Sequence, residues 1–171
     1  PSSVGTPGQP VPPPSSQFRT INPGVFQAAV PSNWTGLSST NAIKLVPQNG
    51  YGELNGQTVF THGVEFGVAR AASRDLSRAT EAWLDTVVQS NPGLKIAGDQ
   101  QALRISQRSA IGTPLVNPSP LGGTERLGVY TAFLADGNLF YYLTIVPESD
   151  RETYRPAFQR ILQSIRFTGV R

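Results

Sequence analysis

The segment TVFTHGVEFGVAR (58–70) contains the residue pair that comes nearest to a chemical site in this sequence. It includes the only histidine of the chain, His62, and Glu65 follows three residues later. A histidine near a carboxylate is typical of metal coordination and of acid–base catalysis. Residues three apart in a regular strand, however, point to opposite faces of the sheet. We therefore expect that His62 and Glu65 do not share a metal ion or a proton while this strand is regular.

Two interpretations of His62 stay open from the sequence. Strand alternation places it on one face with Phe60, Val64 and Phe66, which predicts a histidine at the edge of the core, hydrogen-bonded to backbone or to a hydroxyl. The other interpretation is a binding role, or a bulge that turns the side chain elsewhere. We name Tyr51, His62 and Glu65 as a candidate binding surface.

No known catalytic motif is present in the sequence. Zinc peptidase chemistry of the HExxH kind requires two histidines, and a hydrolase of the GxSxG kind requires a nucleophile elbow that is missing here. The absence of cysteine excludes disulfides, thiolate nucleophiles and cysteine metal sites. The stretch NGYGELNGQT (49–58) lacks the GK[ST] ending of a phosphate loop. We predict no catalytic residue, no cofactor-binding residue and no metal ligand in this chain.

Composition and charge exclude further classes. At 171 residues and 38% hydrophobic content, one folded domain with a real core is expected. The net charge of +3 rests on scattered arginines rather than on the clustered basic stripe that nucleic-acid binding needs. No apolar run approaches the roughly 18 residues of a membrane span. We expect neither nucleic-acid binding nor a transmembrane segment.

The first 17 residues differ from the rest of the chain. They read PSSVGTPGQPVPPPSSQ, with six prolines and no charged residue, which predicts a semi-extended linker. We place the folded domain at residues 18–171. Because the sequence begins with proline instead of methionine, we expect a fragment or a processed product with another domain upstream.

The pattern along the remaining residues predicts strands, a helix, more strands and a second helix. Strands are expected at 26–30, 43–46, 58–70, 101–107, 111–116, 124–135 and 138–146, and helices at 75–90 and from about 153 to 164. Asp136–Gly137 is a strong hairpin signal, and the glycine-rich segment 47–57 is expected to be a flexible loop with Tyr51 at its tip. Ser149 and Glu152 are spaced as a capping box. The fold class that follows is α+β, with helices packed on an antiparallel sheet.

Two stretches resemble a known superfamily. PSNW (31–34) and the ending FYYLTIVPES…YRPAFQRILQSIRF are similar to the PsbP-like superfamily over roughly residues 18–169. This superfamily includes the lumenal PsbP subunits of photosystem II, a Ran-binding nuclear import factor and many exported bacterial proteins. The resemblance implies an α/β/α sandwich with an antiparallel sheet, and a role as an accessory or binding module.

A second resemblance is narrower. GQTVFTHGVEFGVA (56–69), after a proline-rich linker, resembles the C-terminal domain of acidobacterial zinc metallopeptidases of the CAAX prenyl protease clan. It implies a non-catalytic accessory domain of an exported bacterial metallopeptidase, which binds substrate or a partner or regulates the protease. Zinc and its HExxH helix would then belong to the upstream domain, and the location would be periplasmic or otherwise in the cell envelope.

Two alternatives remain beside that hypothesis. The first is a stand-alone periplasmic PsbP-like accessory or binding protein. The second is a small enzyme or ligand binder with a pocket around His62 and the 47–57 segment.

Overall fold

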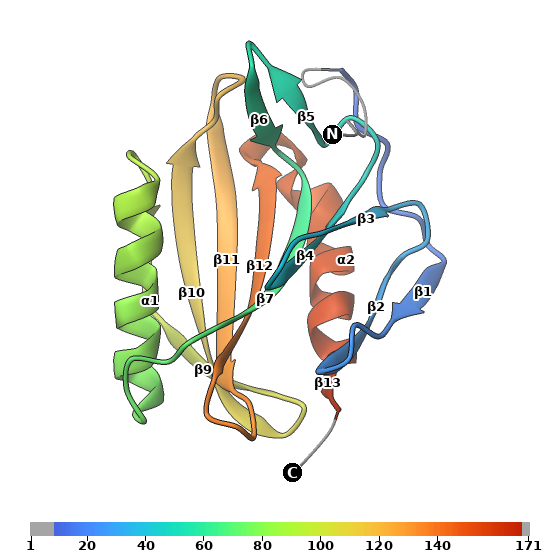
Figure 1. Ribbon diagram of the computed structural model, residues 1–171. Coiled ribbons are helices and arrows are strands. Elements are labelled where there is room, and N and C mark those ends of the chain that lie inside the picture. Colours follow the sequence, from blue (N-terminus) through green and yellow to red (C-terminus); the bar gives the residue numbers. More distant parts are fainter. Residues whose placement is uncertain (1–8, 169–171) are drawn as a thin grey trace.

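A large antiparallel sheet forms the centre of the computed structural model, which describes residues 9–168 (Figure 1). Every strand pair in it is antiparallel, as predicted. Its strands, in spatial order, are β3 (Thr35–Ser38), β4 (Ala42–Val46), β7 (Gly63–Ala69), β12 (Leu139–Pro147), β11 (Thr124–Phe133), β10 (Arg108–Pro118) and β8 (Lys95–Ile96), and β9 (Gln101–Ile105) also pairs with β10. The hairpin predicted at Asp136–Gly137 joins β11 to β12.

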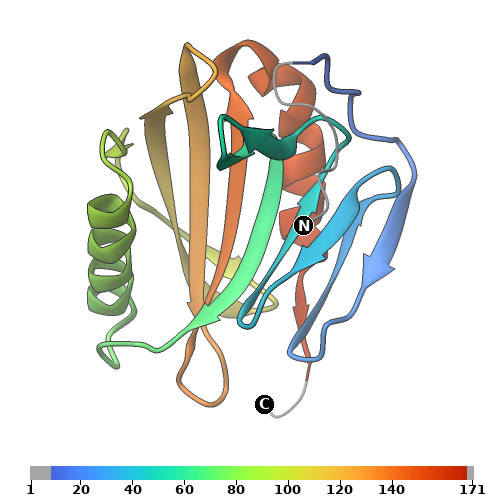
Figure 2. The same cartoon turned by 45° about the horizontal axis from the view of Figure 1, so that its top comes forward.

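Two smaller sheets accompany the central one. One contains β1 (Phe18–Ile21), β2 (Phe26–Pro31) and β13 (Arg166–Phe167), and the other is the hairpin of β5 (Tyr51–Leu54) and β6 (Gln57–Phe60). Figure 2 shows β1 and β2 as a ribbon beside the second helix. Phe26, Ala28 and Val30 of β2 are buried, as their alternation predicts.

The two helices lie on opposite faces of the central sheet. Helix α1 (Leu76–Ser90) packs on β10 and β11, where Thr80 Oγ1 lies 2.8 Å from Thr131 Oγ1. Helix α2 (Arg151–Ser164) covers the other face, where the Tyr142 hydroxyl donates to the Phe158 carbonyl oxygen at 3.0 Å. The α+β class and the α/β/α arrangement are therefore confirmed (Figure 1). Within residues 9–168, neither helix combines the length and hydropathy of a membrane span.

Local residues explain the helix ends. The Asp75 carboxylate accepts the Arg78 N–H at 3.0 Å and caps α1, which agrees with the predicted start at 75. The start of α2 was predicted two residues too late, at Thr153. The turn expected at 149–152 is a 3₁₀ turn at Glu148–Asp150, which leads directly into Arg151, and the capping box for which Ser149 and Glu152 are spaced does not form.

The prediction of a single strand at 58–70 is wrong, because β6 ends at Phe60 and β7 begins at Gly63. Gly63 has a φ of +124°, which ends the regular pleat. The loop predicted at 47–57 is correct only for residues 47–50, because β5 begins at Tyr51, the residue expected at the loop tip. Asn55 and Gly56, at φ 53° and 79°, form a two-residue turn that joins β5 to β6.

The segment predicted as a linker lies partly against the domain. The Tyr154 hydroxyl donates to the Pro12 carbonyl oxygen at 3.0 Å, and the Asn33 side-chain amide donates to the Pro13 carbonyl oxygen at 3.1 Å. Val11 packs against the main core. Residues 1–8 of this segment lie outside the described residues, and the boundary at residue 18 stays a prediction.

Candidate functional site

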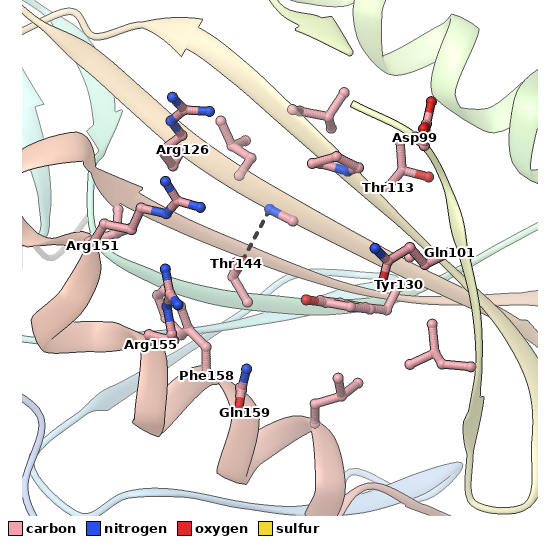
Figure 3. A pocket seen from close by; sticks show the side chains of 18 residues that line it. Asp99, Gln101, Thr113, Arg126, Tyr130, Thr144, Arg151, Arg155, Phe158 and Gln159 are labelled. Atoms are coloured by element: carbon pink, nitrogen blue, oxygen red, sulfur yellow. Dashed lines mark hydrogen bonds between the residues drawn. The ribbon is translucent and has the colours of Figure 1, made fainter. Parts of the chain in front are cut away.

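A groove of about 640 Å³ lies between α2 and the sheet face formed by β10, β11 and β12 (Figure 3). Gly112, Gly128 and Thr144 line its floor, and Arg155 and Phe158 line it from α2. A volume of this size is typical of small-molecule sites. Neither His62 nor any residue of the 47–57 segment lines it.

Small residues set the depth of this groove. Gly112 has no side chain, and a Cβ there would lie 3.1 Å from the Tyr130 ring, so that ring can lie against the Gly112 backbone. The Gly128 N–H donates to the Thr144 hydroxyl oxygen at 3.1 Å, which holds that side chain close to the sheet. These small and closely held side chains therefore leave open space between the strands and α2, which is the groove.

Three arginines from two elements meet at one end of the groove. Arg126 comes from β11, whereas Arg151 and Arg155 come from the first two turns of α2 (Figure 3). The Arg126 Nε–H donates to the Glu148 carboxylate, and this hydrogen bond is the main cause that lowers the pKa of Glu148. Three guanidinium groups thus face the two carboxylates of Glu148 and Glu152, whereas the Asp150 carboxylate is bonded to His62.

The other two arginine pairs differ in strength. The Arg155 Nη2–H donates to Glu152 Oε2 at 2.7 Å. Arg151 Nη1 lies 3.8 Å from Glu148 Oε2, beyond the usual hydrogen-bond distance. The side chains of these pairs are 45% exposed or more, and exposed ion pairs are weak, so an incoming anion can compete for the guanidinium groups.

Tyr130 lies across the middle of the groove. Burial raises the pKa of its hydroxyl, which therefore stays protonated at neutral pH and can donate a hydrogen bond. This hydroxyl makes no hydrogen bond to another group among residues 9–168. Figure 3 shows it directed toward Thr144 and α2. It is a donor available to a ligand.

The opposite end of the groove has the opposite charge. Asp99 and Gln101 lie there, far from the arginines in Figure 3. The groove lining includes no histidine and no cysteine. These side chains can bind and orient a ligand, and the lining offers no nucleophile paired with a base.

His62 lies outside the groove and links two distant parts of the chain. The residue is 5% exposed, and its ring lies with Nδ1 2.9 Å from Thr61 Oγ1 and Nε2 2.9 Å from Asp150 Oδ2. Burial lowers the pKa of His62, and the bond to Asp150 opposes that effect only in part. The neutral ring that results donates through Nε2–H to Asp150 and accepts the Thr61 hydroxyl at Nδ1.

Thr61, His62 and Asp150 follow the order hydroxyl, imidazole, carboxylate, which is the hydrogen-bond order of a catalytic triad. Thr61 is only 3% exposed, and its hydroxyl also lies 3.3 Å from the Gly50 carbonyl oxygen. A substrate carbonyl cannot approach a hydroxyl that is enclosed in this way. The arrangement is therefore structural, since it joins residues 61–62 to Asp150 before α2. Pattern reasoning anticipated the hydroxyl partner and missed Asp150, which is 88 residues away.

Tyr51 and Glu65 lie along a separate row of contacts. The Tyr141 hydroxyl donates to Glu65 at 2.5 Å, and Lys44 Nζ lies 3.6 Å from the same carboxylate. Lys44 also sits 5.9 Å from the centre of the Phe60 ring, which is 6.3 Å from the Tyr51 ring. The row thus connects Tyr51 with Glu65 and does not include His62. Their role as a binding surface stays a prediction.

The groove residues were missed from the sequence because they are distant along it. Arg126 pairs with Val146 across β11 and β12, and this register brings Arg126 to the start of α2. The glycines at 112 and 128 are the only local signal, since glycine inside a strand marks close approach. Among residues 9–168, no group of three or more histidine, cysteine or acidic side chains is placed to hold a metal ion.

Comparison with known proteins gives matches to solved structures only. No protein-family model matches the chain. No curated protein matches its sequence. The chain is similar to the Ran-binding protein Mog1p of Saccharomyces cerevisiae, with a TM-score of 0.61 and 10% identity over 88% of this chain and 95% of that one. It is equally similar to the cyanobacterial PsbP (CyanoP) of Synechocystis sp. PCC 6803, with a TM-score of 0.61 and 9% identity over 89% and 92%.

A third similar structure is LpqN of Mycobacterium tuberculosis, a protein involved in cell envelope biogenesis. Its TM-score is 0.54 at 14% identity, over 90% of this chain and 91% of that one. At such low identity these matches establish the fold. The expected PsbP-like fold is confirmed by them, since PsbP and Mog1p share it.

Proposed function

We propose that this chain is a non-catalytic binding domain whose ligand occupies the groove between α2 and the central sheet. The observation that carries the proposal is the groove itself, with three arginines at one end, an available Tyr130 hydroxyl and a lining that lacks a nucleophile–base pair. The fold neighbours support it, since Mog1p is described as a Ran-binding protein. A protein partner or substrate is the expected occupant.

We place this domain at the C-terminal end of an exported bacterial zinc metallopeptidase. The support is the resemblance of residues 56–69 to such C-terminal domains, together with the proline-rich segment before residue 18. LpqN, which acts in cell envelope biogenesis, supports an envelope location. Zinc would belong to the catalytic domain upstream, and the present domain would hold substrate or regulate access to it.

Native cells provide the test of this parentage. Fractions separated by mass are searched for the tryptic peptide ATEAWLDTVVQSNPGLK (79–95). Detection only well above 18.3 kDa supports an appended domain. Detection near that mass overturns the parentage and favours the second candidate, a stand-alone periplasmic accessory or binding protein.

The groove is tested in the same cells. Arg151 and Arg155 are both changed to glutamate, and the matched control changes Arg74 and Arg78, which are exposed and lie near the start of α1. Reduced processing of envelope proteins in the groove variant alone is the expected result. Equal processing in both variants would show that the groove has no role in function.

A further inference from the structure

We infer that the groove binds the carboxyl-terminal end of an extended peptide, with its free carboxylate at Arg151 and Arg155 and its last side chains between Tyr130 and Phe158. This inference rests on the proposed binding function of the same groove. It adds the chemical class of the ligand and the direction in which the ligand lies.

The arginine end is suited to one carboxylate. Arg151 meets Glu148 only in an exposed ion pair at 3.8 Å, so an incoming carboxylate can compete for its planar fork of N–H groups. A guanidinium group binds a carboxylate through two parallel hydrogen bonds, which gives both strength and orientation. Arg126 and Arg155 each direct one hydrogen bond to a glutamate and keep further donors.

The middle of the groove is suited to a peptide backbone. The Thr144 hydroxyl oxygen accepts the Gly128 N–H, which leaves its own hydrogen free to donate. The Tyr130 hydroxyl is a second donor close by (Figure 3). Peptide carbonyl groups are the acceptors that such donors require. Phe158 and Leu162 of α2 form an apolar wall beside them, so an apolar C-terminal residue is expected.

The far end of the groove favours a peptide over other anions. Asp99 would repel a ligand that carries negative charge along its whole length, such as a nucleic acid. Leu103, Pro114 and Leu115 line the groove together with Asp99 and Gln101, so the lining mixes polar and apolar groups, as the backbone and side chains of a peptide require. A peptide carries one negative charge at its C-terminus and polar amides along the rest, which matches this distribution.

The experiment measures binding of two randomised pentapeptide pools by the isolated chain of residues 1–171. One pool has free carboxylates, and the other is identical but amidated at the C-terminus. Backbone amide shifts of the ¹⁵N-labelled protein report the site and the affinity. We expect the acid pool to shift Gly128, Tyr130 and Thr144, and the amidated pool to bind at least tenfold more weakly.

Two variants locate the carboxylate. The double change R151Q and R155Q is expected to reduce acid-pool binding at least tenfold, whereas R74Q and R78Q leave it unchanged. Their spectra without peptide show whether each variant is folded, and these exposed side chains make folding the expected result. Tyr130→Phe provides a second measurement at the same site and should weaken both pools.

Three results overturn the inference. They are equal binding of the acid and amidated pools, no binding of the acid pool at millimolar concentration, and arginine-dependent binding of phosphatidylglycerol vesicles or inorganic phosphate that exceeds acid-pool binding. If one of these results is found and the R151E and R155E variant still shows defective processing in cells, the peptide inference is wrong and the groove binds another ligand. Normal processing in that variant contradicts the proposed function itself.

Discussion

His62 Nε2 lies 2.9 Å from Asp150 Oδ2, and this bond joins the segment just before β7 to the turn that leads into α2. The ring is buried, whereas the Asp150 side chain is 44% exposed. The bond therefore fixes the start of α2, and with it Arg151 and Arg155, relative to the sheet. The lone histidine positions the groove wall without lining the groove.

The first prediction concerns the pH dependence of stability. The pKa of His62 is lowered from 6.5 in the folded state, so below pH 6.5 the unfolded chain binds a proton that the folded chain does not. The contribution of His62 to stability is complete above pH 6.5 and is lost as pH falls toward the folded-state pKa. In urea denaturation, the stability advantage of the parent chain over His62→Gln should therefore be smaller at pH 5.5 than at pH 7.5.

His62→Gln provides the control for this prediction. Glutamine does not titrate, so the variant should be less stable at pH 7.5 and should lose most of the slope between the two pH values. An unchanged slope in the variant would assign the pH dependence to another group.

The second prediction concerns Glu125, a carboxyl that is only 2% exposed. Its Oε1 atom and Asn117 Oδ1 are both buried without a hydrogen-bond partner, although the Asn117 amide donates to Glu125 Oε2 at 3.2 Å. Burial raises the pKa of Glu125, so the folded chain holds a proton at pH values where the unfolded chain has lost it. The contribution of Glu125 to stability is therefore complete below pH 4.5 and is lost as pH rises through the folded-state pKa.

Glu125→Gln should remove this loss. The glutamine amide N–H can donate to Asn117 Oδ1, which gives that oxygen a partner. The amide nitrogen takes the place of the unpaired Glu125 Oε1. We expect a gain on the order of 1 kcal/mol in the free energy of unfolding at pH 7. The gain should vanish near pH 4, and a variant that is less stable than the parent at pH 7 would contradict this account.

Local signals explain which parts of the fold could be predicted from sequence. The helix at 75–90 has a capping aspartate and a stop at Asn91, and the β11–β12 turn has Asp136–Gly137, so each is specified by neighbouring residues. The break before Gly63 depends on contact with β4, which is distant along the chain. The groove likewise depends on the register that brings Arg126 near α2, and spacing alone does not reveal such a register.

The third prediction tests that break directly. Gly63 has a φ of +124°, and a Cβ there would collide with the Leu45 carbonyl oxygen and lie 3.2 Å from the Val46 Cα. Gly63→Ala should therefore lower the free energy of unfolding by on the order of 2 kcal/mol, through backbone strain and displacement of β4. Thermal and urea denaturation measure this change.

Gly137→Ala is the matched control for that substitution. Gly137 also has a positive φ, of +88°, but a Cβ there would meet nothing within 4 Å. Its free energy of unfolding should fall by only about 1 kcal/mol, the cost of holding alanine in the left-handed conformation. Equal losses at the two positions would mean that the contact with β4 contributes nothing.

The fourth prediction concerns the boundary of the folded domain. A chain that starts at residue 18, where the sequence places the boundary, lacks Val11 and the Pro12 carbonyl oxygen that accepts the Tyr154 hydroxyl. Because that hydroxyl and its apolar surroundings lose their partners, we expect the free energy of unfolding to fall by about 1–3 kcal/mol. A chain that starts at residue 9 keeps both contacts and is the reference for this measurement. Equal stability of the chains starting at 9 and at 18 would place residues 9–17 in the linker after all, and Tyr154→Phe in the longer chain would then also be neutral.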